Sequence, residues 1–390
     1  MSNSKRIRVV QFLNSRVRAG AEEVALELAR GLDPNRFQSY VVCPQELIHA
    51  YAQDWKMIGV VPVSLSLDKP WQWTRAREFI RLLRREEIDI VHAHMICAAL
   101  ASVPLARLAG TPVVLHTCHG REAWRTSWLS RRYWVDRRIA AWTAMTVAVS
   151  ESAAAYLAEV KRINPKRIEV IRNGRPMNQF ERVSQVVEDR LRRDLGIVDG
   201  ETLIGVFGRL EEQKGHRYLL EALPDVLEVH PSCKVIFIGE GSLRKALEES
   251  VQAKGLARYV LFTGYRADCT QVMSICDLII LPSLFEGLPL VPIEAAALGK
   301  PVVATAVDGT REVIADGITG VLVPPAQSPA LAKAVIGLVG DRPRMHALGM
   351  QARQRAEHLF SLERQLRETE ALYVRLLGKS FLQTREAAAA

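Results

Sequence analysis

The feature that most constrains the fold is a repeated alternation of short β-rich apolar runs with helical stretches. In the first half, runs such as "IRVVQFL" and "IDIVHAH" are separated by stretches such as "AEEVALELARGL" and "TRAREFIRLLRREE". Because consecutive parallel strands need a crossover, usually a helix, this alternation predicts parallel sheets with helices on both faces.

The alternation pauses once, at the polar and charged residues 175–201, and then resumes from residue 202 to residue 324. A chain of 390 residues is too long for one compact core. We therefore expect an α/β protein with two Rossmann-like, doubly wound domains, residues 1–180 and 181–342. Their strands are expected to point their carboxyl ends at a central cleft. The tail from about Arg342 to Ser380 is predicted to be helical.

Composition excludes several classes of protein. Hydrophobic residues make up 48% and charged residues 24%, values typical of a folded, water-soluble domain. The longest apolar run contains two histidines and a proline, and no cleavage site follows the basic start, so we predict neither a membrane span nor secretion. The six cysteines lack C-x-x-C spacing, which favours reduced thiols in the cytoplasm and no cysteine metal site.

The net charge of +9 is unevenly distributed. Residues 1–180 hold 27 Lys+Arg against 16 Asp+Glu (+11), and the remainder holds 25 against 27 (−2). The first half is therefore expected to attract anions, which include phospholipid headgroups, phosphorylated glycans and nucleic acid. The sign alone does not choose between them.

Two cations follow an apolar strand in "VFGRLEEQKGH". Arg209 comes directly after the strand and Lys214 directly before a helix, so the two side chains can converge at the strand's carboxyl end. A guanidinium and an ammonium side by side suit a diphosphate. Taken alone, two surface cations on a loop is the simpler interpretation. The P-loop pattern is absent.

Two glutamates stand eight positions apart in "LFEGLPLVPIEAAALGKPVV". Glu286 is placed in a loop, and Pro289 suits the first turn of a helix that contains Glu294. The start of that helix exposes N–H groups, so Leu290 and Val291 can donate to an anion. A carboxylate also suits vicinal sugar hydroxyls. The alternative is one acid that favours the helix dipole and one ordinary surface glutamate.

Together these residues resemble a known family. "FGRLEEQKG", "IGEG", "FTGY", "LPSLFEGLPLVPIEAAALGKPVVAT", "GTREVIADGITGVLVPP" and "VIRNG" are similar to the retaining glycosyltransferases of family 4 (glycosyl transferases group 1). That family has the two-domain GT-B fold, and its signature is the Glu-x7-Glu element. The resemblance covers nearly the whole second half and is looser in the first, in "RAGAEEVALELA", "DIVHAH", "VVLHTCHG" and "VAVSESAA".

The resemblance implies a role for each matching residue. It makes residues 1–180 an acceptor-binding domain and 181–342 a nucleotide-sugar-binding domain, with helices of 343–390 packing back toward the first. It implies donor-binding roles for Gly20, Arg209, Lys214, Arg266 (through its backbone), Glu286, Gly287, Leu290, Val291 and Glu294. Within this set Arg209 and Lys214 hold the diphosphate, Glu294 the ribose and Glu286 the transferred sugar. His119 matches the histidine near the reacting sugar, and the implied catalytic residues are His119, Glu286, Arg209 and Lys214. The family's Gly-Gly loop has Ala19 at its first position here, which puts the loop geometry in question.

The implied mechanism uses no metal ion and no cofactor besides the nucleotide-sugar substrate. Asp-x-Asp, the usual partner of a divalent ion in sugar transferases, is absent. Arg209, Lys214 and the helix dipole stabilise the departing nucleoside diphosphate instead. By analogy with the family, the acceptor hydroxyl attacks on the leaving group's side and a phosphate oxygen takes its proton, with retention and without a covalent intermediate. His119 is expected to position the sugar, with a role as base left open.

Three further histidines lie in predicted strands. His92 and His94 share a strand face and suit metal ligands if a third group joins them. We favour the alternative that they form a structural strand end or a pocket wall. His116 is predicted to be a core residue.

Arg121 to Trp142 holds four of the seven tryptophans, and six arginines against two acids. This composition suits an anionic lipid surface. It also suits single-stranded nucleic acid, and an ordinary domain helix with buried tryptophans remains open. We favour peripheral association with an anionic membrane and a lipid-linked or anionic glycan acceptor, and no nucleic acid.

The leading hypothesis is a retaining glycosyltransferase that moves a hexosyl-type sugar from a nucleotide-diphosphate sugar to a glycan or lipid-linked acceptor, in lipopolysaccharide or other cell-surface polysaccharide synthesis. We expect it in the cytoplasm, with attachment to the cytoplasmic face of the inner membrane as an open extension. The main alternative is a non-hydrolysing nucleotide-sugar epimerase of the same fold. A glycoside hydrolase that uses the two glutamates is a third hypothesis, disfavoured because a hydrolase has no nucleotide to hold. A non-catalytic binding protein is the last.

Overall fold

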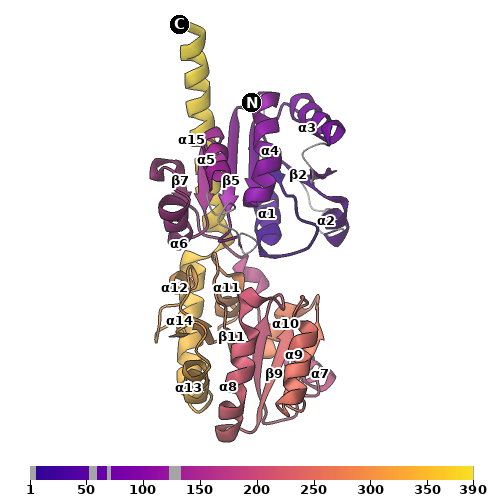
Figure 1. Cartoon of the computed structure of the whole chain (residues 1–390), viewed down its shortest axis with the longest axis vertical. Coiled ribbons are helices and arrows are strands. Elements are labelled where there is room, and N and C mark those ends of the chain that lie inside the picture. Colours follow the sequence, from indigo (N-terminus) through magenta and orange to yellow (C-terminus); the bar gives the residue numbers. More distant parts are fainter. Residues whose placement is uncertain (1–5, 52–58, 68–71, 123–132, 390) are drawn as a thin grey trace. The chain divides into compact units, whose positions relative to one another are not determined.

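The computed structural model describes the backbone of residues 6–51, 59–67, 72–122 and 133–389, with side chains through residue 378. It forms two compact units: Met1–Gly174 with Leu362–Ala390, and Arg175–Ser361. Each unit is built on one parallel sheet with helices on both faces (Figure 1). The fold class predicted from the alternating sequence is thus observed in both units.

The sheet of the first unit has strand order β3-β2-β1-β4-β5-β6-β7 among the described residues. The strands are β1 (Ile7–Phe12), β2 (Phe37–Cys43), β3 (Val60–Ser64), β4 (Ile90–His94), β5 (Val113–Cys118), β6 (Met145–Ala148) and β7 (Ile168–Val170). The order reverses beside β1, so β1 and β4 meet at the switch point of a doubly wound sheet.

Strand side chains alternate between two cores. On one face, Val10 and Phe12 pack with α3 and α4, whereas Val9 on the opposite face packs with α15. The helices of this unit are α1 (Gly20–Gly31), α2 (Gln45–Ala50), α3 (Trp73–Arg85), α4 (Met95–Ala109), α5 (Trp134–Trp142), α6 (Glu151–Ala155) and α15 (Leu362–Ala389). This period-2 division of β1 is expected of a strand that is buried on both sides.

The sheet of the second unit has strand order β10-β9-β8-β11-β12-β13. Its strands are β8 (Thr202–Phe207), β9 (Cys233–Ile238), β10 (Val260–Gly264), β11 (Leu278–Leu281), β12 (Val302–Thr305) and β13 (Val321–Val323). Strands β8 and β11 are hydrogen-bonded neighbours although about 70 residues separate them, so their carboxyl ends bring distant loops together.

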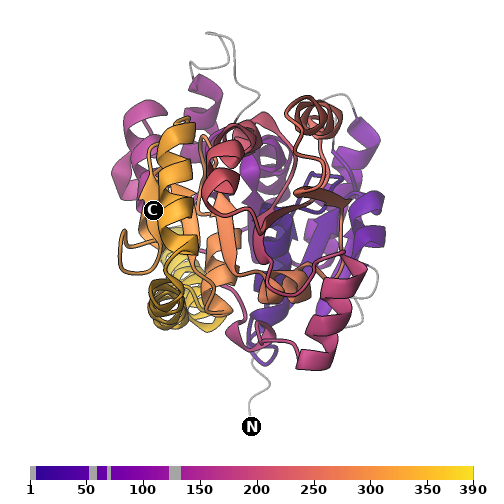
Figure 2. The same cartoon turned by 90° about the horizontal axis from the view of Figure 1, so that it is seen from below.

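The helices of the second unit are α7 (Gln185–Asp194), α8 (His216–Val229), α9 (Arg244–Ala253), α10 (Cys269–Ile275), α11 (Leu290–Ala297), α12 (Thr310–Val313), α13 (Ser328–Val339) and α14 (Arg342–Leu359). Figures 1 and 2 show helices of this unit on both faces of its sheet. One core joins α8, α9, α13 and α14 to the sheet. Helix α14 also packs its Ala352 and Ala356 on Ala296 of α11.

The boundaries differ from those expected. The chain divides at Gly174 and Arg175 rather than after residue 180, because Arg175 pairs by its backbone with Phe360 and Ser361 of the second unit. The tail is two helices that belong to different units. Helix α14 stays with the second unit, where Gly349 lies so close to Gly299 that a Cβ on Gly349 would lie 2.1 Å from the Gly299 carbonyl oxygen. Only α15, from Leu362 onward, packs on the first.

Helix α2 ends at Ala50, and residues 52–58 lie outside the described part. Within the described residues, no helix combines the length and the apolar character that a membrane crossing requires. No disulfide links any of the six cysteines, all of which lie in the described part of the chain.

Candidate functional site

Arg209 and Lys214 lie on the loop that leaves the carboxyl end of β8. The loop ends in a single turn, Glu212–Lys214, and Gly215 then begins α8 with a left-handed φ of 62°. A Cβ on Gly215 would lie 2.1 Å from the carbonyl oxygen of Pro282, so only glycine lets this loop approach the end of β11. That approach brings Lys214 to the loop that follows β11.

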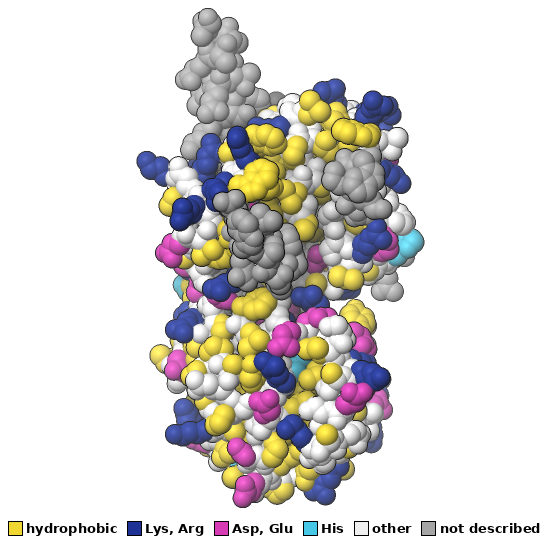
Figure 3. Space-filling model, viewed as in Figure 1, with side chains coloured by type: hydrophobic (Ala, Val, Ile, Leu, Met, Phe, Trp, Pro, Cys, Tyr) yellow, Lys and Arg dark blue, Asp and Glu magenta, His cyan; other side chains and the backbone are white. Residues whose placement is uncertain are grey.

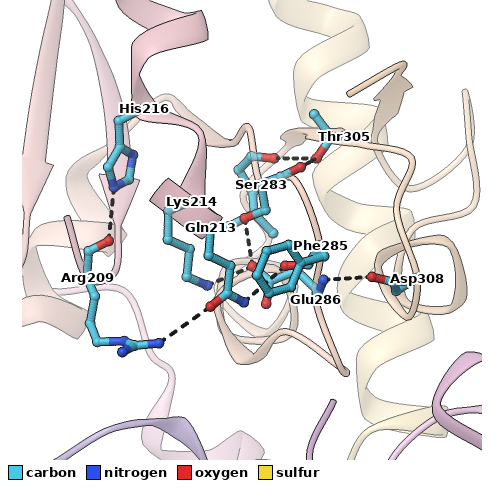
Figure 4. A network of polar contacts seen from close by, with 10 residues as sticks. Arg209, Gln213, Lys214, His216, Ser283, Phe285, Glu286, Thr305 and Asp308 are labelled. Carbon is cyan, nitrogen blue, oxygen red and sulfur yellow. Dashed lines mark hydrogen bonds and ion pairs between the residues drawn. The ribbon is translucent and has the colours of Figure 1, made fainter. Parts of the chain in front are cut away.

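Lys214 meets Glu286 there. The Lys214 ammonium lies 2.7 Å from Glu286 Oε1, and the same oxygen accepts a hydrogen bond of 2.6 Å from the Ser283 hydroxyl. The side chain of Glu286 is only 6% exposed and that of Lys214 is 14% exposed. A carboxylate can lie this deep because a cation and a hydroxyl both satisfy it. Figure 4 shows the three side chains converging from the two loops.

Gln213 links the remaining cation to this pair. Its side-chain amide donates to the Phe285 carbonyl at 3.0 Å, and its Oε1 accepts from Arg209 at 3.5 Å (Figure 4). Its backbone carbonyl accepts the Leu284 N–H at 2.8 Å. Arg209, Lys214 and Glu286, expected to act together, are thus brought into one network. Gln213 itself was missed, because a glutamine in a polar loop gives no signal in the sequence.

Two more residues bind the backbone of the loop that contains Glu286. Asp308 accepts the backbone N–H of Glu286 at 3.0 Å, and the Thr305 hydroxyl donates to the Ser283 carbonyl. Asp308 adopts a positive φ of 35°, which is uncommon outside glycine. Asp308 gives no signal in the sequence either, because its contact depends on how the loop after β12 folds over the loop after β11.

His216, at the start of α8, fixes the backbone of Arg209. Its Nε2 lies 3.1 Å from the Arg209 carbonyl, and burial lowers the pKa of the imidazole to about 4. The ring is therefore neutral at pH 7. Because a carbonyl only accepts, Nε2 donates and Nδ1 carries no proton.

The start of α11 lies directly after this loop. Pro289 precedes the helix with no side-chain cap, so by helix geometry the N–H groups of Leu290 and Val291 have no acceptor within the helix. Gly287, between Glu286 and the helix, packs tightly on Gly309, where a Cβ would lie 1.9 Å from its carbonyl oxygen. The expected donors therefore stand next in the chain to the network of Lys214 and Glu286.

Glu294 lies in α11 and has a partner that the sequence did not predict. Arg175, which was assigned to the linker, forms an ion pair with it at 3.0 Å between Nε and Oε1. The side chains are 12% and 18% exposed, and the Arg175 guanidinium also lies over the ring of Phe180. The predicted contact of Glu294 with a ribose stays a prediction.

Arg266 follows β10 and the bend at Gly264. Its guanidinium donates two hydrogen bonds to Asp268, at 2.8 and 2.6 Å. The side chain of Arg266 is therefore paired within its own loop. The expected contact between the backbone at Arg266 and a nucleobase stays a prediction.

Gly20 and His119 belong to the first unit. Gly20 is exposed and begins α1, and Ala19 before it has an extended φ of −151°, a conformation that any residue adopts. Alanine in place of the family's first glycine therefore causes no backbone strain at this position.

His119 follows β5, beside the two histidines at the end of β4. His94 Nδ1 lies 3.2 Å from His119 Nε2, and the rings of His92 and His94 stack with centroids 4.5 Å apart. Burial, reinforced by neighbouring histidines, lowers the pKa of His92 to about 3, and burial lowers that of His119 to about 4. Among the described residues, no cluster of three His, Cys, Asp or Glu side chains is arranged to hold a metal ion.

His116 is buried, as predicted for a core residue, and burial lowers its pKa to about 3. The Arg/Trp-rich stretch is described only at its ends, because residues 123–132 lie outside the described part. In α5, Trp134 and Trp142 are 61% and 46% exposed. These two tryptophans are therefore not core residues.

Two family models match consecutive parts of the chain. Glycosyltransferase Family 4 matches residues 18–179, and Glycosyl transferases group 1 matches residues 187–355. The two matched ranges correspond closely to the two parallel-sheet parts of the structure.

Relatives and solved structures agree with these matches. An Escherichia coli UDP-Gal:alpha-D-GlcNAc-diphosphoundecaprenol alpha-1,3-galactosyltransferase is 24% identical over 96% of this chain and 98% of its own length. The lipopolysaccharide core biosynthesis mannosyltransferase LpsB of Rhizobium meliloti is 26% identical over 80% of this chain and 83% of its own. The crystal structure of Anabaena HepE in complex with UDP-glucose superposes with a TM-score of 0.83 at 22% identity, over 94% of this chain and 99% of that one. The structure of WaaG, a glycosyltransferase involved in lipopolysaccharide biosynthesis, superposes with a TM-score of 0.68 at 18% identity, over 91% and 97%. With its two Rossmann-like units and both family models matched in order, the chain belongs to the group 1, family 4 glycosyltransferases of the GT-B fold.

Proposed function

We propose that this glycosyltransferase moves a hexosyl-type sugar from a nucleotide-diphosphate sugar to a glycan or lipid-linked acceptor. The observation that carries the proposal is the convergence of Arg209, Lys214 and Glu286 next to the start of α11. Two cations and free helix N–H groups suit a diphosphate, and a buried carboxylate suits sugar hydroxyls. One relative, named for UDP-Gal as donor and alpha-D-GlcNAc-diphosphoundecaprenol as acceptor, supports this class of substrate.

In the proposed reaction, Arg209 and Lys214 stabilise the charge of the departing nucleoside diphosphate. Their two positive charges supply electrostatic stabilisation that a divalent ion supplies elsewhere, so the reaction is proposed to need no metal. Lys214 exchanges its contact with Glu286 for a phosphate oxygen, and Glu286 turns to the sugar. The acceptor attacks on the same side as the leaving group, which retains the anomeric configuration.

A panel of UDP-, GDP- and ADP-sugars tests the donor. A ligand that binds only the folded chain raises its melting temperature, so one base should stabilise the chain more than the others. The stabilising donor is then mixed with lipid-linked and soluble glycan acceptors, with and without a chelator. Retention should appear in the proton coupling constant of the new glycosidic bond, and the rate should be unchanged by the chelator. An inverted product, or loss of activity on chelation, overturns that part of the proposal. Conversion of the donor sugar without any acceptor indicates the epimerase instead.

We also propose that the first unit docks on an anionic membrane. The exposed Leu108, Trp134 and Trp142 lie on α4 and α5, close to the exposed Arg107 and Arg138. Figure 3 shows hydrophobic and basic side chains intermixed over these helices. Tryptophan and arginine are the residues that favour a lipid headgroup interface.

Sedimentation with vesicles tests this docking. The chain should sediment with anionic vesicles but not with neutral ones, and high salt should release it because charge contributes to the attraction. Trp134→Ser should weaken the binding, whereas the exposed Leu261→Ser on the second unit should not. Equal binding to both kinds of vesicle contradicts the proposal. The membrane proposal concerns the acceptor side, and its outcome does not depend on the donor site.

A further inference from the structure

His119 is one end of a chain of buried hydrogen bonds in the first unit. His119 Nε2 lies 3.2 Å from His94 Nδ1, and His94 Nε2 lies 2.8 Å from the side-chain oxygen of Gln11. His94 is 1% exposed and Gln11 is completely buried. His119 itself is half-buried. Bulk water does not reach His94 or Gln11, so their polar atoms must be satisfied by neighbouring groups.

The chain continues from Gln11 to the C-terminal helix. The Gln11 amide nitrogen donates to the Tyr373 hydroxyl at 3.0 Å, and that hydroxyl lies 2.6 Å from His92 Nδ1. His92 Nε2 lies 2.6 Å from the Thr117 hydroxyl. Tyr373 comes from α15, so a helix distant in the sequence completes the network.

The chemistry of each group sets the direction of the chain. The side-chain oxygen of Gln11 only accepts, so His94 Nε2 must carry the proton. Burial holds the pKa of His94 well below its ordinary value, and the ring is neutral with a single N–H. His94 Nδ1 therefore accepts, and within the described part of the chain its donor is the Nε2–H of His119. On the far side, Gln11 donates to Tyr373, whose own proton goes to His92.

The geometry points to His94 and Gln11 as positioning residues that hold His119 in its Nε2–H tautomer and so present Nδ1 as a hydrogen-bond acceptor. Among the described residues, no side chain or backbone group hydrogen-bonds to that Nδ1. A tautomer fixed in this way is set by the partner of the other nitrogen, as in many histidine sites.

This arrangement limits what His119 can bind. A neutral Nδ1 without a proton accepts a hydrogen bond from a hydroxyl or an N–H group and offers nothing to a carboxylate or phosphate oxygen. The group that it binds is therefore a hydrogen-bond donor, which in the proposed substrate is a hydroxyl. This conclusion rests on the proposed function only for the identity of that substrate, a sugar or its acceptor. The tautomer itself is a property of the free chain.

Nitrogen-15 NMR on the full chain, labelled at histidine, tests the tautomer without any ligand. The two-bond proton–nitrogen pattern distinguishes Nε2–H from Nδ1–H in a neutral ring, and His119→Gln identifies the His119 signals by their loss. At pH 7 we expect His119 to be neutral and protonated on Nε2. A proton on Nδ1 would mean that the Gln11 amide is turned the other way and the chain runs in reverse, which overturns the inference. Neither result depends on whether the chain transfers sugars.

Variants test whether the network, rather than the ring's own preference, sets the tautomer. His94→Leu and Gln11→Leu should shift the averaged nitrogen signals of His119 toward the mixture of an unconstrained imidazole. His94→Asn should restore the signals, because its side-chain oxygen can accept where Nδ1 did. Thr117→Val, at the far end of the chain, is the matched control and should leave them unchanged. Unchanged signals in both leucine variants contradict the inference.

Kinetics then separate positioning from stability. With a donor that the enzyme uses, His94→Leu should lower kcat/KM about tenfold or more, and His94→Asn should recover most of it. A donor analogue that lacks the hydroxyl bound by His119 should be used equally by wild type and His94→Leu. If His94→Leu lowers kcat/KM by the same factor for every analogue, the role of His94 is structural and the inference fails. If the NMR result holds but no donor reacts, the proposed function fails and the tautomer assignment stands.

Discussion

The ammonium group of Lys214 lies 2.7 Å from the carboxylate of Glu286, in side chains that are almost fully withdrawn from solvent. The two residues stand 72 positions apart in the chain and meet because β8 and β11 are neighbours. In the absence of a nucleotide, each neutralises the other. If Lys214 holds the donor diphosphate as proposed, the diphosphate has to compete with Glu286 for the lysine.

Glu286→Gln tests that competition. Removing the negative charge frees Lys214 for phosphate, so we expect free UDP or another nucleoside diphosphate to bind more tightly, by about 1 kcal/mol. Sugar transfer should fall sharply, because an amide accepts hydroxyl protons less well than a carboxylate does. Calorimetric titration and a transfer assay measure the two effects. Glu249→Gln, an exposed carboxylate paired with Lys245, is the matched control and should change neither. Weaker nucleotide binding in Glu286→Gln would contradict the competition.

Gln213→Ala tests the link between the two loops. Its side chain bonds both Arg209 and the Phe285 carbonyl, so its loss should leave Arg209 and the Glu286 loop less well ordered. We expect a rise in KM for the donor and a loss of about 1 kcal/mol in stability. Steady-state kinetics and urea unfolding measure these effects. The control is Gln185→Ala, because Gln185 is exposed and its side chain donates to Asp189 within its own helix. Equal kinetics for the two variants would show that Gln213 has no role in ordering the site.

A double-mutant cycle on Arg175 and Glu294 measures their coupling. Both side chains are largely buried, so Arg175→Met should destabilise the second unit more than the loss of a surface ion pair would. We expect a coupling free energy of about 1 to 2 kcal/mol with Glu294→Gln, obtained from urea unfolding of both single variants and the double variant. The surface pair Arg353 and Glu357 serves as the comparison and should couple by less than about 0.5 kcal/mol. Additive effects at Arg175 and Glu294 would contradict the ion pair.

Acid should destabilise the first unit through its buried histidines. Burial is the main cause that lowers the pKa of each histidine: to about 3 in His92 and His116, to about 4 in His119, and well below the ordinary value in His94. In the unfolded chain the same groups have a pKa near 6.5, so the unfolded state binds more protons below that pH. Above about pH 6.5 these histidines are neutral in both states and do not lower the free energy of unfolding. Below that pH the free energy of unfolding falls as the pH drops toward 4, by about 1 kcal/mol per pH unit for each histidine.

Urea unfolding between pH 7 and pH 5, followed by a probe in the first unit, measures that slope. His116→Asn should reduce the slope, because unfolding of this variant takes up about one proton fewer than unfolding of wild type. A slope that is the same in His116→Asn and in wild type would show that His116 does not gain a proton on unfolding.

Parts of this structure follow from local patterns and parts do not. The alternation of strands and helices predicts both parallel sheets, because apolar residues recur at a different period in a strand than in a helix. The meeting of Lys214 and Glu286 also follows, since both stand just after strands of one parallel sheet. Gln213, Asp308 and Arg175 were missed. Their roles depend on hydrogen bonds between loops, and a polar loop residue with a tertiary partner looks the same in sequence as one without.

The boundary between the two units could also be predicted only approximately from the sequence. The polar stretch after residue 174 marks a connection, but its edge is set by the pairing of Arg175 with Phe360 and Ser361, almost two hundred residues later. The helical tail reads as one continuous segment. Its break lies at Phe360, which is buried, and neither glycine nor proline marks it.

Arg209 and Lys214 are proposed to hold the diphosphate of the donor, and equilibrium titration with the preferred nucleoside diphosphate measures this role. Wild type is compared with Arg209→Ala, Lys214→Ala and the control Lys245→Ala, whose side chain is 90% exposed. We predict that each of the first two variants weakens binding by about 1.5 to 3 kcal/mol, roughly ten- to hundredfold, and that the control binds as wild type does. Unchanged affinity in both Arg209→Ala and Lys214→Ala would mean that neither residue holds the diphosphate.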